Sequence, residues 1–242
     1  MRPRLEAVFF GDGQYPRLAR ALALSAQRHC PGWDVNVRRI DPHVRAASGN
    51  EADAANHHKL CEWRRLVEGA HDGARILLVD ADTFVTAPLD SLWEREFDLA
   101  YTVRDASRSR FPLNAGVVAV RVGPATRRFM DAWSERDAAF LRDIEARGPW
   151  RQRYGGQNQA SLGAILESGL AAALGLKVAT LPCLEWNAED TSWERFNPAV
   201  TKIVHVKGAL RMAVFGIASS QHVRPLARMW RDLDTQLTEA VA

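Results

Sequence analysis

Two aspartates, Asp80 and Asp82, follow a short apolar run and could together hold a cation. Residues 76–79 read Ile-Leu-Leu-Val, a branched run that is typical of a strand buried on both faces. Side chains two positions apart on a strand point the same way, so both carboxylates should face one point at the strand end. Their hard oxygens suit Mg²⁺ or Mn²⁺, ions that commonly carry a substrate diphosphate. An ordinary turn or helix cap is the alternative for this pattern.

A second group of chemically useful residues lies near the C-terminus. His205 stands near the end of a strand expected over residues 201–206, and Lys207, Gly208 and Arg211 follow it. A glycine beside two cations suits a diphosphate. A histidine at a strand end is more often a core residue, and that alternative stays open at this point.

Two further segments could contact a ligand at the same edge of a sheet. The turn after the first expected strand carries Asp12 and Tyr15, which could bind a ribose and stack on a base. Asn114 offers a donor and an acceptor at a strand start, and Gly116 lets the backbone approach a ligand closely. The alternatives are an ordinary turn before a helix and a plain buried strand with a bulge.

The later polar segments have less specific signals. Asn158 and Gln159 open an expected helix, where amides suit an oxygen-rich ligand or ordinary capping. Residues 104–110 and 147–153 are basic, and residues 148–156 are expected to form a loop that is mobile or faces an acceptor. A solvated basic face is the alternative. His57 and His58 are adjacent on a helix and are expected at the surface.

The elements that must position these residues alternate along the chain. Apolar patterning predicts strands over residues 5–10, 33–40, 76–79, 97–103, 114–120, 176–181 and 201–206, with 184–187 continuing the sheet or lining a cleft. It predicts helices over residues 17–29, 56–69, 124–147, 157–169 and 225–240. A strand–helix–strand unit at the N-terminus implies parallel strands. The fold class predicted is therefore α/β.

Composition agrees with an ordinary enzyme of one domain. The chain has 242 residues, of which 47% are hydrophobic and 25% charged, and a net charge of +3. That charge is too mild to indicate nucleic acid, although it fits an anionic substrate. The three cysteines are scattered and are expected to be reduced thiols of the core. No apolar run has the length of a membrane span, no signal peptide is evident, and the expected location is the cytoplasm.

These segments together resemble the glycosyltransferases of the GT-A fold, most of all the retaining family 8 group that includes glycogenin and bacterial galactosyltransferases. The resemblance is carried, in family order, by Lys59-Leu60 through Trp63 to Asp80-Ala81-Asp82-Thr83, by Asn114-Ala115-Gly116-Val117, by Asn158-Gln159-Ala160-Ser161-Leu162, and by His205-Val206-Lys207-Gly208-Ala209-Leu210-Arg211. It implies one catalytic domain over residues 1–242, with a Rossmann-like mixed sheet, a nucleotide-binding half over 1–103 and a sugar and acceptor half over 104–242.

The resemblance also implies a role for each matched residue. Mn²⁺ or Mg²⁺ would be bound by Asp80, Asp82 and His205. The donor would be bound by Asp12, Tyr15, Lys59, Asp80, Asn114, Gly116, Gly208 and Arg211. The residues at the reacting sugar would be Asn158, Gln159 and Asp82.

The chain departs from the family pattern at two of these positions. Asn158 stands where the family usually has an acid, and Arg211 stands where it has a lysine. The Pro-Trp that often follows that lysine is replaced by Met212-Ala213. Arg211 keeps the positive charge but changes its geometry. A role that needs negative charge at residue 158 is therefore not supported.

The function implied is sugar transfer with retention from a nucleotide diphosphate sugar, with UDP favoured, to a hydroxyl acceptor. The acceptor stays open among a glycan, a lipid-linked glycan, a protein and a modified nucleic acid. One alternative is a haloacid dehalogenase-like phosphatase with Asp80 as nucleophile, although Phe84 stands where its motif has threonine. The other is a sugar-nucleotide-binding protein without catalysis.

Overall fold

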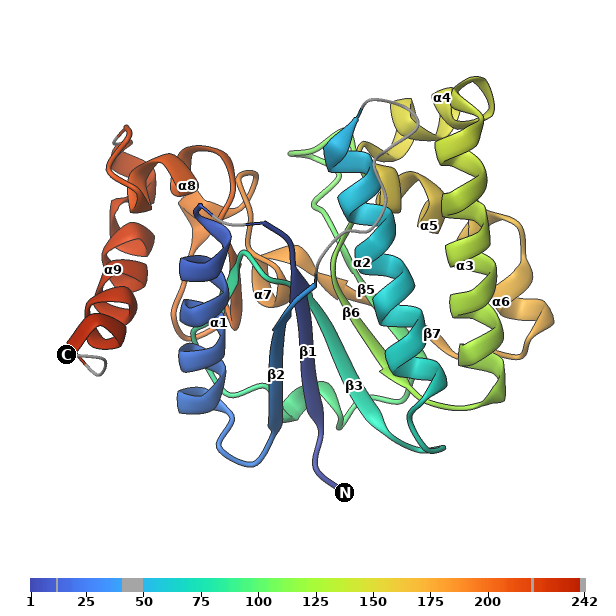
Figure 1. Ribbon diagram of the computed structural model, residues 1–242, viewed down its shortest axis with the longest axis horizontal. Coiled ribbons are helices and arrows are strands. Elements are labelled where there is room, and N and C mark those ends of the chain that lie inside the picture. The colour runs from blue at the N-terminus through green and yellow to red at the C-terminus, as the bar shows by residue number, and fades with distance from the viewer. Residues whose placement is uncertain (12, 41–49, 219, 240–242) are drawn as a thin grey trace.

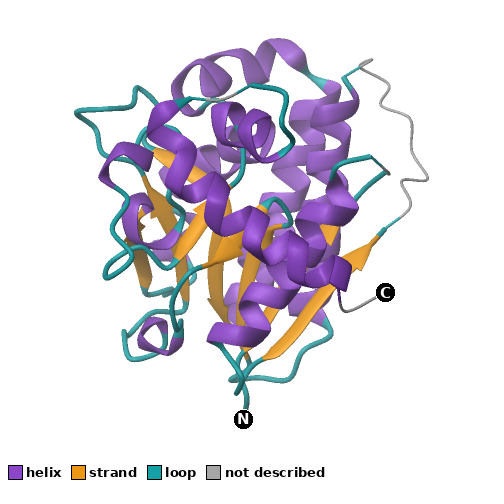
Figure 2. Ribbon diagram, turned by 90° about the vertical axis from the view of Figure 1, so that its left-hand side faces the viewer, coloured by secondary structure: helices purple, strands orange, loops and turns teal. Residues whose placement is uncertain are grey.

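The computed structural model has a central sheet that is covered by helices on both faces (Figure 1, Figure 2). The structure describes residues 1–11, 13–40, 50–218 and 220–239. The strands are β1 (Arg4–Phe9), β2 (Asp34–Arg39), β3 (Arg75–Asp80), β4 (Thr83–Val85), β5 (Leu99–Val103), β6 (Leu113–Arg121), β7 (Val178–Pro182) and β8 (Ile203–His205). The helices are α1 (Tyr15–His29), α2 (Glu51–Glu68), α3 (Pro124–Arg142), α4 (Ile144–Tyr154), α5 (Gln157–Glu167), α6 (Leu170–Ala173), α7 (Cys183–Trp186), α8 (Gly208–Val214) and α9 (Arg224–Glu239). Short 3₁₀ turns lie at Asp90–Leu92, Trp193–Arg195 and Gln221–Val223.

The main sheet is mixed, as the sequence predicts. Within the described residues its strand order is β2-β1-β3-β6-β5-β7. Strand β1 runs parallel to β2 and β3, which confirms the parallel unit at the N-terminus. Strand β6 runs antiparallel to both β3 and β5, and β5 is parallel to β7. A separate pair, β4 and β8, is antiparallel.

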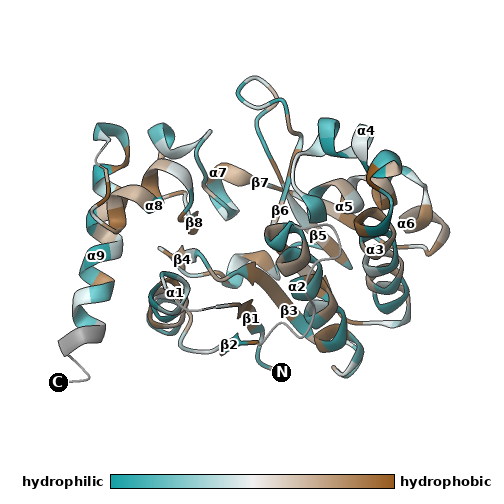
Figure 3. Ribbon diagram, turned by 45° about the horizontal axis from the view of Figure 1, so that its top comes forward, coloured by the Kyte–Doolittle hydropathy of each residue, from teal (hydrophilic) through white to brown (hydrophobic). Residues whose placement is uncertain are grey.

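Strand β3 is buried on both faces, which is why its sequence is apolar without alternation. Leu77 and Val79 pack in a cluster with α1, whereas Ile76 and Leu78 pack in a cluster with α2 and α3. All four side chains are fully buried. In Figure 3, β1 and β3 have the brown colour of hydrophobic residues. A strand enclosed in this way holds the residue at its end, Asp80, in a fixed place.

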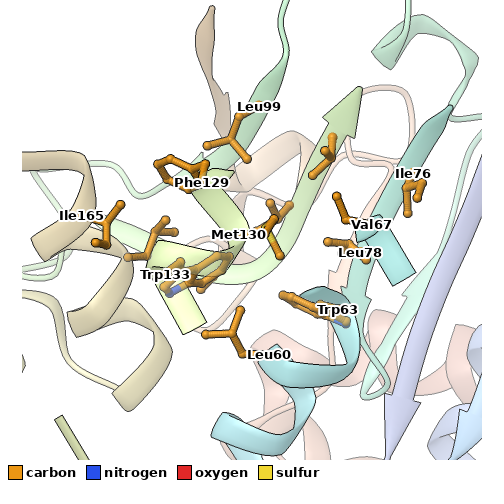
Figure 4. Close-up of a cluster of buried hydrophobic side chains, with 14 of the residues drawn as sticks. Leu60, Trp63, Val67, Ile76, Leu78, Leu99, Phe129, Met130, Trp133 and Ile165 are labelled. Atoms are coloured by element: carbon orange, nitrogen blue, oxygen red, sulfur yellow. The ribbon is translucent and has the colours of Figure 1, made fainter. Parts of the chain in front are cut away.

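Helices α2, α3 and α5 cover one face of the sheet with large side chains (Figure 4). Trp63 of α2 and Trp133 of α3 meet edge to face, with ring centres 6.5 Å apart, next to Leu60, Phe129 and Ile165. Burial of each large side chain stabilises the fold by about 1.5–3 kcal/mol. This cluster fixes α2, the helix that carries Lys59.

Helices α1, α8 and α9 enclose a third cluster at the other side of the molecule, shown at the left of Figure 1. Leu18 of α1, Phe84 of β4, Val204 of β8, Leu210 of α8 and Trp230 of α9 pack together there. The small β4–β8 sheet is therefore held by the C-terminal helices. The predicted closing helix is confirmed as α9 over its described residues.

Three sequence predictions on this part of the fold are wrong. Residues 144–154 form helix α4 where the sequence predicts the end of one long helix and then a loop. Buried Arg147 donates to Asp53 Oδ2 at 2.8 Å and to Gln157 Oε1 at 3.0 Å, and Arg151 also donates to Asp53. These contacts hold α4 in place despite Pro149 inside it. The basic residues of this segment therefore brace the fold.

The other two errors concern helix limits and a histidine. Helix α2 begins at Glu51, well before the predicted start at residue 56, because Asn50 caps it by accepting from the Asp53 amide. His57 is not a surface residue, because its Nδ1 lies 2.9 Å from a carboxylate oxygen of buried Asp137. Of the two alternatives for residues 184–187, continuation of the sheet is excluded, because Cys183–Trp186 form the short helix α7.

Two further expectations concern the state of the cysteines and the length of the apolar segments. Cys30, Cys61 and Cys183 are all free thiols, and Cys30 and Cys183 lie in the core as expected, whereas Cys61 is partly exposed. Among the described residues, none of the helices combines the length and the apolar character needed to cross a membrane.

The close contact between α4 and α5 makes a first prediction. A Cβ added to Gly163 would lie 2.5 Å from Cδ2 of the buried Tyr154 ring. Gly163→Ala should therefore lower the free energy of unfolding, measured by urea denaturation, by about 1–3 kcal/mol despite the better helix propensity of alanine. Gly32→Ala is the control, because its Cβ meets nothing within 4 Å. A Gly163→Ala protein as stable as the control would contradict this packing.

Candidate functional site

Asp80, Asp82 and His205 converge at the carboxyl end of β3. One ligand atom from each lies within 4.8 Å of the others. The backbone sets this arrangement: the chain turns after Asp80 and enters β4, whose pairing with β8 puts Thr83 opposite His205. The Val206 amide donates to the Asp82 carbonyl at 2.6 Å and closes the pairing. Two acids and a histidine thus meet, although 123 residues separate Asp82 from His205 in the chain.

Each carboxylate divides its two oxygens between the histidine and a cation. Asp80 Oδ1 lies 2.5 Å from Lys59 Nζ, and its Oδ2 lies 3.8 Å from His205 Nε2. Asp82 Oδ1 lies 3.2 Å from His205 Nε2, and its Oδ2 accepts from Arg211 Nη2. The two acids therefore satisfy the rule that buried charges are paired.

The cations around Asp82 keep it ionised. Burial on its own raises the pKa of this carboxyl, but the charges of His205, Arg211 and Lys59 and the hydrogen bond with His205 outweigh burial and lower the pKa to about 2. Asp82 is consequently a carboxylate across the neutral range. The site can offer anionic oxygen ligands without first losing a proton.

Asn187 orients the imidazole of His205. Its Oδ1 lies 3.1 Å from His205 Nδ1, so Nδ1 carries the hydrogen and Nε2 faces the two acids. Asn187 in turn donates to Thr102 Oγ1 at 3.1 Å, and Thr102 donates to the carbonyl of Asn114 at 2.6 Å. Such a partner is typical of a metal-binding histidine. Asn187 belongs to the segment 184–187, which the sequence places in the sheet or beside a cleft without indicating a contact with His205.

Gly116 allows β6 to lie directly against the acids and the histidine. A Cβ at this position would lie 2.8 Å from Asp80 Oδ2 and 3.0 Å from His205 Cε1. The Gly116 amide donates to Asn114 Oδ1 at 2.9 Å, which holds the buried Asn114 side chain along the strand. Any larger residue at position 116 would displace the candidate ligands.

A cleft of 320 Å³ opens over this group. It is lined by Val8, Phe9, Phe10, Tyr15, Ala52, Ala55, Asn56, Lys59, Asp80, Ala81, Asp82, His205, Lys207 and Arg211. Of the residues predicted from sequence, Tyr15 and Lys59 thus share the cleft with Arg211 and the three candidate ligands. The Arg211 guanidinium lies over the Tyr15 ring, 5.3 Å from its centre. Lys207, expected from the sequence beside a diphosphate, also lines the cleft, whereas Phe9 and Phe10 were not predicted there.

A second hollow of 360 Å³ shares Lys207 with the cleft. It is lined by Arg104, Arg108, Ser109, Arg110, Phe111, Gly155, Gly156, Gln159, Glu189, Asp190, Thr191 and Lys207. Glu189 is fully buried, 2.6 Å from Lys207 Nζ and 3.2 Å from Arg104 Nε. Burial on its own raises the pKa of Glu189, but its hydrogen bond with Asp190 and these cations lower it. The predicted basic segment 104–110 therefore lines a hollow next to the cleft.

The remaining predicted residues lie around these two hollows. Asn158 is buried and donates from Nδ2 to the carbonyl of Asn56, a cleft residue, while its Oδ1 has no hydrogen-bond partner among the described residues. Gln159 donates to the Tyr154 carbonyl and lines the second hollow. Gly208 begins α8 with φ +46°. Asp12 lies outside the described residues.

Comparison with known proteins places the fold among glycosyltransferases. No family model and no curated protein sequence matches the chain. The solved galactosyltransferase LgtC, in complex with donor and acceptor sugar analogues, matches 96% of this chain over 95% of its own with a TM-score of 0.58 and 13% identity. A glycosyltransferase involved in glycosylation of the PBCV-1 major capsid matches 86% of this chain over 97% of its own, with a TM-score of 0.56 and 11% identity.

A third similar structure is the apo form of the glycosyltransferase GlyE of Streptococcus pneumoniae. It matches 100% of this chain over 64% of its own, with a TM-score of 0.59 and 13% identity. At such identities the likeness concerns the fold. The predicted GT-A type fold, a mixed sheet between helices, is thereby confirmed.

The lowered pKa of Asp82 predicts how stability depends on pH. Because the folded-state pKa is about 2 and the ordinary value is 3.8, this carboxylate stabilises the fold above about pH 4 and loses that contribution as pH falls through 2. In metal-free buffer, the free energy of unfolding of Asp82→Asn should therefore fall less between pH 4 and pH 2 than that of the wild type. The difference between the two decreases should be up to about 2 kcal/mol. Urea denaturation at each pH measures this. Parallel pH curves for the two proteins would contradict the assigned pairing.

Proposed function

We propose that the chain is a metal-dependent glycosyltransferase that moves a sugar from a nucleotide diphosphate sugar to a hydroxyl acceptor. The observation that carries this proposal is the convergence of Asp80, Asp82 and His205 in a cleft that also presents Lys59 and Arg211. This group lies at the strand end of a fold shared with glycosyltransferases. Ligands of open α/β sheets bind at that edge.

The donor set fits Mn²⁺ or Mg²⁺. Two carboxylates supply hard oxygen atoms and His205 supplies one imidazole nitrogen, a set that Mn²⁺ accepts readily. Asn187 holds Nε2 of His205 toward the carboxylates, and Gly116 leaves room beside them. When bound, the ion would neutralise charge that develops on the departing diphosphate.

The cations of the cleft suit the diphosphate of the donor. Lys59 and Arg211 each touch one of the acids, and Lys207 lies at the border with the second hollow. Charged donors aimed at a leaving phosphate stabilise it more as its charge increases in the transition state. Tyr15, partly exposed at the cleft, offers a ring on which a nucleotide base can stack. A uridine base is the one favoured by the sequence resemblance.

The second hollow is the proposed acceptor site. It adjoins the cleft at Lys207 and contains Gln159, as expected for a group next to the transferred sugar. Transfer breaks the bond between the anomeric carbon and the diphosphate oxygen and forms one to the acceptor oxygen. The acceptor proton then passes to the leaving diphosphate. Retention is proposed from the family resemblance. It is compatible with an amide at Asn158, because the leaving diphosphate can take the acceptor proton and no base is required there.

The phosphatase alternative is weaker in this arrangement. A nucleophilic Asp80 needs a free oxygen, but Lys59 Nζ lies 2.5 Å from its Oδ1, and His205 Nε2 lies 3.8 Å from its Oδ2. His205 between the two acids is more consistent with metal binding.

Metal-dependent donor binding is the first test. The midpoint temperature of thermal unfolding of the wild type should rise by about 5 °C when Mn²⁺ is added together with saturating UDP or a UDP-sugar. The rise should be much smaller with Mn²⁺ alone or with the nucleotide alone. Asp82→Ala should abolish the joint shift because it removes a metal ligand. Asp72→Ala, which removes an exposed carboxylate outside the cleft, should retain it. An undiminished shift in Asp82→Ala would refute the metal assignment, and a shift with another nucleotide only would replace the uridine assignment.

The second test concerns Asn187. Asn187→Ala should weaken Mn²⁺ binding about 10- to 100-fold, as expected for the partner of a ligating histidine. Asn187→Asp should restore most of it, because its carboxylate still accepts from Nδ1. Titration of Mn²⁺ followed by the nucleotide-dependent thermal shift measures both. Equal losses in the two variants would indicate that Asn187 supports only the fold.

A further inference from the structure

A second cluster of reactive side chains lies outside the cleft, between α2, α3 and α5. Cys61 Sγ lies 3.5 Å from Nε2 of His57, which stands one turn earlier on α2. His57 Nδ1 lies 2.9 Å from Asp137 Oδ2 on α3. This order of thiol, imidazole and carboxylate is the arrangement by which an adjacent base activates a nucleophile.

The carboxylate end of the cluster is rigidly held. Asp137 is fully buried, and its Oδ1 accepts from Ser161 of α5 at 2.5 Å while its Oδ2 faces His57. Both oxygens are thus engaged, and His57 is the cation that balances this buried charge. The hydrogen bonds with Asp137 and Cys61 raise the pKa of His57 to about 9. His57 is consequently an imidazolium beside the thiol at neutral pH.

The thiol end is partly open and electrostatically favoured as a thiolate. Cys61 is partly exposed, and Ser134 Oγ of α3 lies 3.6 Å from its sulfur. Burial on its own raises the pKa of Cys61, but the hydrogen bonds with His57 and Ser134 and the charges of His57 and Arg64 lower it. Asp131 and Glu68 both pair with Arg64, and Asp137 pairs with His57.

The remaining cysteines lack these features and provide an internal comparison. Cys30 and Cys183 are both buried. Burial is the main cause that raises the pKa of Cys30 to about 11 and that of Cys183 to about 12. Thiolates react and thiols do not, so these two should stay inert in the folded protein.

We propose that Cys61 is a nucleophilic modification site, activated by His57 and Asp137, that takes hydroperoxides. The thiolate sulfur attacks one peroxide oxygen, the S–O bond forms as the O–O bond breaks, and the sulfur loses two electrons to become a sulfenic acid. The peroxide is reduced by the same two electrons. The leaving hydroxide or alkoxide takes a proton from the His57 imidazolium and departs as water or an alcohol.

The site is separate from the cleft although both use α2. Lys59 and Cys61 are two residues apart and point to different partners, Asp80 of β3 and Ser134 of α3. The proposal therefore does not depend on the sugar-transfer function. Cys61→Ser should keep the nucleotide-dependent thermal shift of the wild type.

Alkylation with iodoacetamide, followed residue by residue by mass spectrometry, tests the thiolate. At pH 7, Cys61 of the folded protein should react at least about tenfold faster than Cys30 and Cys183, with an apparent pKa below the ordinary value of about 8.5. His57→Gln should slow Cys61 about tenfold and return its pH profile to about 8.5 or above. Ser134→Ala, which keeps His57, should slow it less. Circular dichroism verifies that each variant is folded.

Two outcomes of the alkylation experiment would overturn the proposal. One is a Cys61 rate no faster than that of the buried cysteines. The other is a Cys61 alkylation rate that depends on pH as for an ordinary thiol and that neither Ser134→Ala nor a folded His57→Gln changes. In that case the cluster would only connect the helices. Hydrogen peroxide with dimedone should then give an adduct at Cys61 in the wild type and none in Cys61→Ser. Absence of that adduct in the wild type would reject the hydroperoxide.

Discussion

The structure depends on balancing two carboxylates at the end of a buried strand. Asp80 and Asp82 cannot stay charged there without partners. Their partners come from three separate elements: Lys59 of α2, His205 of β8 and Arg211 of α8. The charge requirement of one turn thus ties an early helix and the C-terminal third of the chain to β3. The same requirement makes the site compatible with a divalent cation.

The apolar clusters make that balance possible by fixing each partner. The α2–α3–α5 cluster positions the backbone of Lys59 through Leu60 and Trp63. The cluster of α1, α8 and α9 holds Val204 and Leu210, one residue before His205 and one before Arg211. Packing therefore determines where the polar groups can meet. In turn, only a packing arrangement that pairs every charge of these groups is stable.

The parts of the site with strong local signals were predictable. Strand β3, its two acids and the glycine of β6 are recognised from short runs, because burial on both faces leaves a direct trace in composition. Lys59, His205 and Arg211 were expected there only through the family resemblance, because local patterning does not show which distant residues meet. Asn187 beside His205 leaves no periodic pattern, because its role depends on a tertiary contact.

Helix α4 and His57 were missed for the same physical reason. Arg147 finds its buried partner Asp53 94 residues earlier, and His57 finds Asp137 80 residues later. Local composition favours a loop at residues 148–156 and a surface histidine at 57, and only the folded chain supplies the opposite charges. Prediction from sequence was therefore reliable where consecutive residues are buried. It was unreliable where a charge is paired with a residue far away in the chain.

The pairing of acids with cations in the cleft has a consequence for the proposed reaction. Lys59 and Arg211 now neutralise Asp80 and Asp82. If the carboxylates ligate a divalent ion, the two cations lose part of their partners' charge and become free to bind a diphosphate. If the cations bind a diphosphate first, the carboxylates become better metal ligands. The exchange of partners thus couples the two binding events favourably, and by thermodynamic linkage each ligand should strengthen the binding of the other by the same factor.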